Sequence, residues 1–253
     1  LAGTYPERTG SAVAAASGVD VALWDLAGKH YGAPVCELAG GAPSEVRAYA
    51  SNLYWDDPDA MAETAAGFRE AGFDAMKAHL GQGPEADERR VAAIREAVPD
   101  VDLMVDLNCG YDRPTARREG KMLADYDVFW YEEPIDPDDL EGYEMLARDL
   151  DVPIAAGENV FTARGFRRLF ETGAVDYAMP DVIHNFGTGI GLAATLHAIA
   201  ATPAADLLEF DADGWALYEP LLADDLAVDD GRVAVPAGPG LGVELPDGIA
   251  EYE

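Results

Sequence analysis

Short apolar runs alternate with longer amphipathic stretches along most of this chain. The apolar runs are too short for buried helices and are bounded by Gly, Pro, Asn and Asp, so they predict strands. They lie at residues 46–54, 75–80, 103–108, 129–133, 154–159, 177–181 and 207–211. The stretches between them carry apolar residues three or four positions apart, as Met61, Ala65 and Phe68 do, and predict helices. These helices lie at residues 58–71, 84–98, 114–126, 138–150, 162–172 and 187–201.

Regular repetition of strand and helix predicts an α/β fold with a parallel sheet. The strands are apolar along their whole length, which is typical of strands that are covered on both faces. We therefore expect the sheet to close into a (β/α) barrel, with its chemistry on the loops at the C-terminal ends of the strands.

The number of strands falls short of the eight that such a barrel needs. Six are visible through Asp181, followed by a single later one, and only Val182 and Ile183 separate Asp181 from His184. We expect a helix and a strand, about 25 residues in all, to be missing from this sequence around residues 181–184. Omission of residues that the natural chain carries explains the gap better than a true deletion, which would expose strand edges.

The predicted barrel occupies residues 46–211 and has a segment on each side of it. Residues 1–45 form a leading helix that runs into the barrel. Residues 212–253 are rich in glycine and proline and predict a short hairpin and loops instead of another strand–helix unit.

The composition is strongly acidic. The 253 residues include 48 Asp and Glu against 17 Lys and Arg, for a net charge of −31. This charge repels phosphate groups, so it argues against nucleic-acid and anionic-membrane partners. The acids are spread along the whole chain, and we interpret them as a halophilic surface suited to high salt, where screening weakens self-repulsion. An ordinary acidic protein is the alternative.

Cysteine usage and hydropathy favour a cytoplasmic protein. Cys36 and Cys109 give no disulfide framework, and we interpret Cys109 as a small packed residue, not a nucleophile. No apolar run reaches the ~20 residues of a membrane span, and no signal peptide is visible.

Acidic residues close four successive strands at nearly equal intervals. Asp106, Glu132 and Glu158 are each separated by 26 residues, and Asp181 follows after 23. One strand–helix unit takes about that many residues, so the acids occupy equivalent points of neighbouring units. Carboxylates that converge at one rim repel one another unless a cation lies between them. A ligand set made only of oxygen selects a hard ion, and we predict Mg²⁺; three solvated strand-end acids are the alternative.

The order and spacing of several motifs together resemble the enolase superfamily, in its mandelate racemase-like branch. The matching motifs are Ala22-Leu23-Trp24-Asp25-Leu26-Ala27-Gly28-Lys29, Lys77-Ala78-His79, Asp106-Leu107-Asn108, Glu132-Glu133-Pro134, Gly157-Glu158-Asn159, Met179-Pro180-Asp181, His184 and Leu208-Glu209. The resemblance implies a modified TIM barrel preceded by an α+β capping domain that this sequence lacks, with the 212–253 tail returning toward that domain. It also implies homo-oligomers and a small carboxylate substrate.

The resemblance assigns a role to each matching residue on the strands. Asp106, Glu132 and Glu158 are similar to the Mg²⁺ ligands, and Lys77 is similar to the lysine that neutralises the substrate carboxylate. His79 stands where many relatives have a second lysine that acts as a base. An imidazole can also accept a proton, although a histidine that binds substrate or supports the metal ligands is the alternative.

The remaining matches concern the opposite side of the site. Asp181 and His184 resemble an Asp–His pair in which the aspartate orients the imidazole and the histidine is an acid or base. Glu209 resembles a protonated acid that binds the substrate carboxylate, with an ordinary strand-end glutamate as the alternative. Asn108 and Asn159 are expected to support the metal ligands, and Asn108 also to bind substrate.

The expected activity is the dehydration of a sugar acid, an aldonate or an aldarate. A base at Lys77 or His79 would take the α-proton, and Mg²⁺, Lys77 and Glu209 would hold the resulting ene-diolate. His184 would protonate the departing β-hydroxyl to give a 2-keto-3-deoxy acid. A racemase or epimerase of a 2-hydroxy acid, or a barrel that binds sugar acids without catalysis, are the alternatives.

Overall fold

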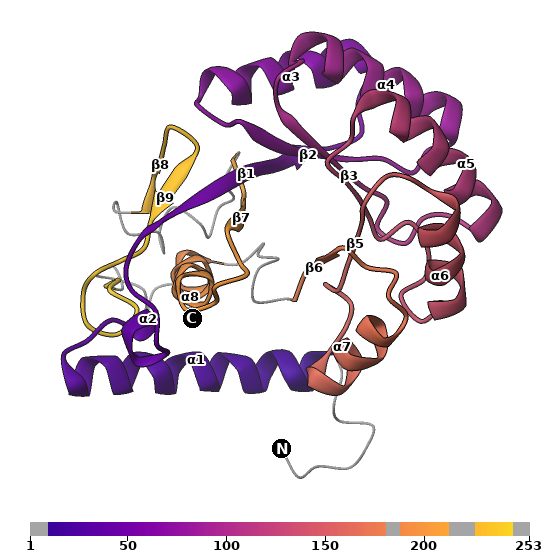
Figure 1. Cartoon of the computed structure of the whole chain (residues 1–253). Coiled ribbons are helices and arrows are strands. Elements are labelled where there is room, and N and C mark those ends of the chain that lie inside the picture. The colour runs from indigo at the N-terminus through magenta and orange to yellow at the C-terminus, as the bar shows by residue number, and fades with distance from the viewer. Residues whose placement is uncertain (1–9, 181–187, 213–225, 245–253) are drawn as a thin grey trace. The chain divides into compact units, whose positions relative to one another are not determined.

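The computed structural model describes residues 10–180, 188–212 and 226–244 (Figure 1). The chain forms two compact units. One is Tyr49–Asp181, and the other combines Leu1–Ala48 with Val182–Glu253.

The unit Tyr49–Asp181 is built on a sheet of parallel strands in chain order. The strands are β1 (Glu45–Leu53), β2 (Ala75–His79), β3 (Asp102–Asp106), β4 (Trp130–Glu132), β5 (Ile154–Ala156) and β6 (Tyr177–Ala178). Each of β2 to β6 pairs in parallel with the strand before it. The register aligns His79 with Asp106, and Asp106 with Glu132, so the polar residues at the strand ends form one row.

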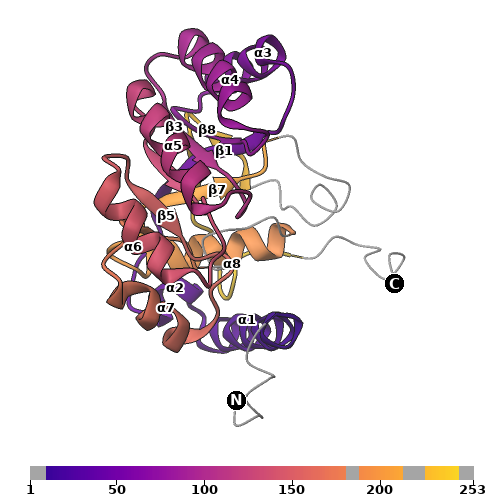
Figure 2. The same ribbon diagram turned by 90° about the vertical axis from the view of Figure 1, so that its right-hand side faces the viewer.

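Helices connect the strands of this unit and lie along the outer side of the sheet (Figures 1 and 2). They are α3 (Pro58–Glu70), α4 (Pro84–Ala97), α5 (Arg113–Leu123) with the 3-10 turn η2 (Ala124–Tyr126), α6 (Leu140–Asp149) and α7 (Thr162–Glu171). Local sequence sets where they begin: Asp112 accepts a hydrogen bond from Thr115 N, and Asp139 accepts one from Gly142 N. These side chains satisfy amide groups that the first turn leaves unpaired. The repetition of strand and helix predicted from the sequence is confirmed.

The other unit joins the two ends of the described chain. It contains α1 (Ser11–Tyr31), α2 (Val35–Leu38), α8 (Gly189–Ala200), β7 (Leu207–Phe210), β8 (Val228–Asp229) and β9 (Arg232–Ala234). The first residues of β1 pair antiparallel with β9, and β8 and β9 form the hairpin predicted in the tail. A Cβ atom on Gly28 of α1 would lie 2.5 Å from Gly240 Cα, so glycine is required where these segments meet.

Strand ends differ most from the sequence prediction. The run at 154–159 predicted a strand, yet β5 stops at Ala156 because Gly157 turns the chain with φ +141°. A Cβ atom there would lie 2.8 Å from Met179 O, so only glycine fits this turn. The gap expected around residues 181–184 lies outside the described residues. Among the helices that the structure describes, none is long and apolar enough to cross a membrane.

Candidate metal centre

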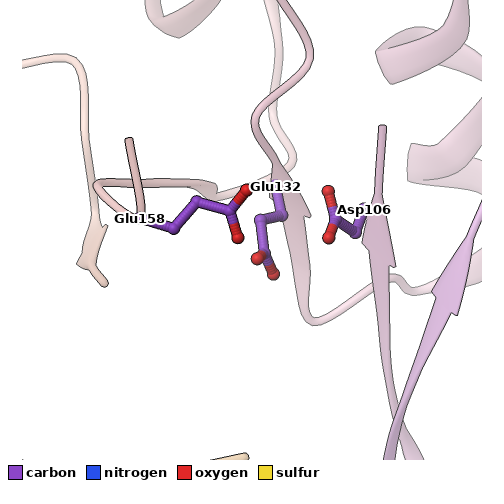
Figure 3. A group of neighbouring side chains, drawn as sticks. All are labelled: Asp106, Glu132 and Glu158. Atoms are coloured by element: carbon purple, nitrogen blue, oxygen red, sulfur yellow. The ribbon is translucent and has the colours of Figure 1, made fainter. Parts of the chain in front are cut away.

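Three carboxylates from neighbouring strands meet at the C-terminal ends of β3, β4 and β5. Asp106 and Glu132 are the last residues of their strands, and Glu158 follows the turn at Gly157. One oxygen from each residue can be chosen so that the three lie within 4.8 Å of one another. Figure 3 shows the three side chains pointing toward one another. Asp106 and Glu132 are fully buried, and Glu158 is half-buried.

The ammonium group of Lys77 lies against this cluster. Its Nζ is 2.9 Å from Glu132 Oε1 and 3.4 Å from Asp106 Oδ2, and the lysine side chain has no exposed surface. Trp130 Nε1 donates a hydrogen bond to the other oxygen of Glu132, at 2.9 Å. Three carboxylates beside one ammonium leave two negative charges in a buried place, where charge is costly unless it is compensated.

These residues fit a hard divalent cation. Oxygens on opposite sides of such an ion lie roughly 4 to 5 Å apart, which agrees with the 4.8 Å span of the three ligand atoms. A charge of +2 would offset the net negative charge of the three carboxylates and Lys77, and carboxylate oxygens are the ligands that Mg²⁺ and Ca²⁺ prefer.

His79 lies beside the cluster with both ring nitrogens in contact with polar atoms. Its Nε2 is 3.0 Å from Ser51 O, and its Nδ1 is 3.1 Å from Asn108 Oδ1 and 3.5 Å from Asp106 Oδ2. A carbonyl oxygen only accepts hydrogen bonds, so Nε2 must carry a hydrogen. The ring also stacks on Tyr54, with centroids 4.7 Å apart. His79 is thus held in one orientation by four neighbours.

Asn108 joins His79 to Asp106. Its backbone N donates to Asp106 Oδ1 at 2.8 Å, and its Nδ2 donates to Asp106 Oδ2 at 3.1 Å. The amide oxygen of Asn108 is therefore the atom that faces His79. These two bonds hold the carboxylate of Asp106 in place, and the role of Asn108 beside a metal ligand stays a prediction.

Two of the predicted catalytic residues, Asp181 and His184, lie outside the described residues. Glu209 is fully buried on β7 in the other unit, and its role stays a prediction. Cys109 donates through Sγ to Glu133 Oε2 at 3.0 Å, and burial together with this carboxylate raises the pKa of its thiol, which makes Cys109 unsuited to be a nucleophile.

Sequence reasoning overlooked Glu133. This residue is fully buried directly after β4, and burial raises the pKa of its carboxyl group. It accepts hydrogen bonds from the loops on both sides of Glu132. The signal was present in the Glu132-Glu133-Pro134 motif, because two adjacent acids at a strand end point to opposite faces and cannot serve the same purpose.

A unit of parallel strands with carboxylates at their C-terminal ends is the arrangement of metal-dependent (β/α)-barrel proteins. The comparison with protein families specifies to which family of such proteins this chain belongs. Residues 60–187 and 182–249 match the family described as enolase C-terminal domain-like. Residues 3–40 match the N-terminal domain of mandelate racemase / muconate lactonizing enzyme, which assigns α1 and α2 to that domain, so part of the capping domain that we expected to be missing is present. The chain belongs to the enolase superfamily, in its mandelate racemase / muconate lactonizing enzyme-like branch, and the enolase-like barrel fold is confirmed.

Similar proteins cover almost the whole chain. The D-galactarolactone cycloisomerase of Agrobacterium fabrum is 35% identical over 97% of this chain and 75% of its own length. The L-talarate/galactarate dehydratase of Salmonella typhimurium is 35% identical over 97% of this chain and 67% of its own length. The crystal structure of the 3,6-anhydro-D-galactonate cycloisomerase from Zobellia galactanivorans matches with a TM-score of 0.90 and 32% identity, over 97% of this chain and 76% of that one.

Proposed function

We propose that this protein is a Mg²⁺-dependent dehydratase of a sugar acid, an aldonate or an aldarate. The observation that carries the proposal is the cluster of Asp106, Glu132 and Glu158, whose ligand atoms lie within 4.8 Å of one another beside the buried ammonium of Lys77. The similarity to L-talarate/galactarate dehydratase supports the choice of substrate class.

The reaction removes the proton on the carbon next to the substrate carboxylate. The product of this step carries two negative charges, and a bound dication stabilises that charge as it develops. Lys77 would contribute a further positive charge at the same place. Loss of the β-hydroxyl as water then gives an enol, which tautomerises to the 2-keto-3-deoxy acid.

The geometry around His79 favours a donor role over that of base. Its Nε2 is committed to Ser51 O, and its Nδ1 faces the oxygen of Asn108. A hydrogen on Nδ1 would satisfy that oxygen and could be passed to the departing β-hydroxyl. Lys77 Nζ is already paired with two carboxylates, Glu132 at 2.9 Å and Asp106 at 3.4 Å. Asp181 and His184 lie outside the described residues, and their part in the proton transfers stays the prediction made from the sequence.

A cycloisomerase is the second candidate, because two of the similar proteins carry that name. If the oxygen on the β-carbon belongs to a ring, the same elimination opens the ring and releases no water. A racemase would instead return the α-proton to the opposite face.

One assay separates these activities. The protein is incubated in Mg²⁺ and high salt with aldonic and aldaric acids, their lactones and anhydro sugar acids, and each product is analysed by mass spectrometry and NMR in heavy water. A product lighter by one water, lost on chelation by EDTA, supports the dehydratase. A new product of unchanged mass supports the cycloisomerase, and α-proton exchange with inversion supports a racemase. A protein that binds these acids without turnover under all conditions would contradict catalysis.

We also propose that this sequence lacks a helix and a strand that its relatives have between the positions of Asp181 and His184. The match to the C-terminal family falls into two parts that meet at residues 182–187. The comparison with D-galactarolactone cycloisomerase extends over 284 residues, whereas this chain has 253, so at least 31 positions of the relative have no counterpart here. Grafting that relative's segment between the two residues should raise the midpoint of thermal unfolding, and an unchanged or lower midpoint would argue against the proposal.

A further inference from the structure

Glu133 is fully buried beside the metal ligands and is not one of them. Four hydrogen bonds end on its carboxylate. Its Oε2 accepts from Cys109 Sγ at 3.0 Å and from Asn159 Nδ2 at 2.6 Å. Its Oε1 accepts from Gly157 N at 3.5 Å and from Asn159 N at 3.4 Å. The donors come from the β3–α5 loop on one side and the β5–α7 loop on the other.

These two loops hold the outer ligands of the metal cluster. The β3–α5 loop begins directly after Asp106, and the β5–α7 loop carries Glu158 between two residues that donate to Glu133. Asn159 Nδ2 also donates to Glu158 Oε1 at 3.1 Å, so a single amide group joins Glu133 to a metal ligand. Backbone bonds follow the same path, from Cys109 N to Glu133 O at 2.8 Å and from Glu133 N to Ala155 O at 3.0 Å.

The backbone around Glu133 adopts a conformation that needs such support. Asn108, Cys109 and Glu133 have φ values of +43°, +61° and +35°. Non-glycine residues are uncommon in this region, and they stay there only when surrounding contacts hold them. The carboxylate of Glu133 supplies such contacts, because it binds Cys109 directly.

A second buried acid shows that burial alone does not give a carboxylate the hydrogen bonds that Glu133 accepts. Glu119 on α5 is also fully buried, yet neither of its oxygens has a hydrogen-bond partner among the described residues. Glu119 therefore makes none of the hydrogen bonds by which Glu133 connects two loops of the proposed metal centre.

We propose that Glu133 is a positioning residue that fixes the separation of Asp106 and Glu158 and so tunes the affinity of the centre for its cation. This inference rests on the proposed metal site. Removing one acceptor oxygen from Glu133 should release the β5–α7 loop first, because Asn159 contributes two of the four bonds. Residues that orient metal ligands in this way typically affect affinity by about 10- to 100-fold.

The test is isothermal titration calorimetry with MgCl₂ on the wild type, Glu133→Gln and the control Glu119→Gln. Glutamine keeps the shape of glutamate, but its amide group would face either Asn159 Nδ2 and Cys109 Sγ or the backbone N of Gly157 and of Asn159, all of which are donors themselves. We expect Glu133→Gln to bind Mg²⁺ about 10- to 100-fold more weakly and Glu119→Gln to bind it like the wild type. For activity, the Mg²⁺ concentration giving half-maximal rate should rise, while kcat at saturating Mg²⁺ changes much less.

The results distinguish a failure of the positioning role of Glu133 from a failure of the proposed metal site. If the wild type binds Mg²⁺ and Glu133→Gln binds it equally well, the positioning role is wrong and the metal site stands. If the wild type binds no divalent cation, both proposals fail. Should Glu133→Gln not fold, Asn159→Ala and Cys109→Ala remove donors from the same network. A weaker affinity in Asn159→Ala than in Cys109→Ala supports the role, and wild-type affinity in both overturns it.

Discussion

Lys77 Nζ lies 2.9 Å from Glu132 Oε1, and neither side chain is exposed. The same ammonium is 3.4 Å from Asp106 Oδ2 and 5.7 Å from the centroid of the Tyr49 ring. One cation on β2 therefore partly neutralises two proposed metal ligands, Asp106 on the neighbouring strand β3 and Glu132 on β4 beyond it.

We expect Lys77→Met to separate metal binding from catalysis. Removing a positive charge beside the cluster should leave Mg²⁺ affinity equal to or higher than that of the wild type, because like charges repel. Without metal, the variant should lose about 3–5 kcal/mol of stability, since buried carboxylates lose their partner. Turnover should disappear even at saturating Mg²⁺.

Calorimetry with MgCl₂, together with thermal unfolding with and without the ion, checks this expectation. Lys77→Arg, which keeps the charge, serves as the control for metal-free stability. A large loss of Mg²⁺ affinity in Lys77→Met would contradict this expectation. It would show that the lysine positions the ligands for the ion, and that this effect outweighs the repulsion between the two positive charges.

Tyr111 connects the loop after β2 to the loop after β3. Its hydroxyl donates to Asp87 and accepts from Gly83 N at 2.7 Å, while Asp87 also accepts from Gly81 N at 3.0 Å. Tyr111→Phe leaves both partners short of a hydrogen bond and should lower the free energy of unfolding by about 1–3 kcal/mol.

Urea unfolding measures this loss of stability, with Tyr126→Phe as the control. The Tyr126 hydroxyl contacts Glu88 at 3.4 Å on the surface, so its loss should be within about 0.5 kcal/mol. Equal losses of unfolding free energy in the two variants would contradict the idea that Tyr111 connects the two loops.

The fold could be predicted from the sequence because the strands of this unit are short, apolar and separated by amphipathic helices. The helix expected at 84–98 is observed as Pro84–Ala97, and the strand expected at 75–80 as Ala75–His79. Strand ends were less predictable. The apolar residues after Ile154 continue, but the positive φ of Gly157 and its approach to Met179 end the strand, and both are properties of the packed structure.

The clustering of the three carboxylates was predictable because equal spacing in the chain becomes adjacency in a parallel sheet. Asp106 aligns with Glu132 in the register, as the spacing implied. The role of Glu133 was not predictable, because its partners Cys109 and Asn159 belong to loops whose conformations the apolar pattern does not encode. For His79, the backbone carbonyl of Ser51 decides which nitrogen carries a hydrogen, and no side-chain motif reports that contact.

The net charge of −31 leads to a prediction about salt. Raising KCl from 0.1 M to 1 M shortens the screening length from about 10 Å to about 3 Å, so the midpoint of thermal unfolding should increase steadily over this range. A variant with three exposed acids on α3 and α6 made neutral, Glu63→Gln, Glu70→Gln and Glu141→Gln, should show a smaller increase. If both proteins respond equally, the salt acts through solvent exclusion and not through charge.

Glu119 gives a prediction about pH. Burial, and then the charges of Asp87 and Glu88, raise its pKa from 4.5 to about 8. In the unfolded chain this carboxyl group ionises above pH 4.5, whereas in the folded protein it stays protonated until about pH 8. The folded state thus binds the extra proton between these values, so the contribution of Glu119 to stability is fully present below pH 4.5 and is lost as pH rises toward 8.

Glu119→Gln removes this dependence, because glutamine is neutral in both states. The free energy of unfolding of the variant should exceed that of the wild type by an amount that grows by roughly 1 kcal/mol per pH unit between pH 5 and 8 and levels off above pH 8. Urea unfolding of both proteins at pH 5, 6.5 and 8 in constant high salt measures the difference, and contributions from the other acids cancel in it. A difference that does not change with pH would mean that Glu119 ionises in the folded protein much as it does in water, and that α4 and α5 admit solvent to it.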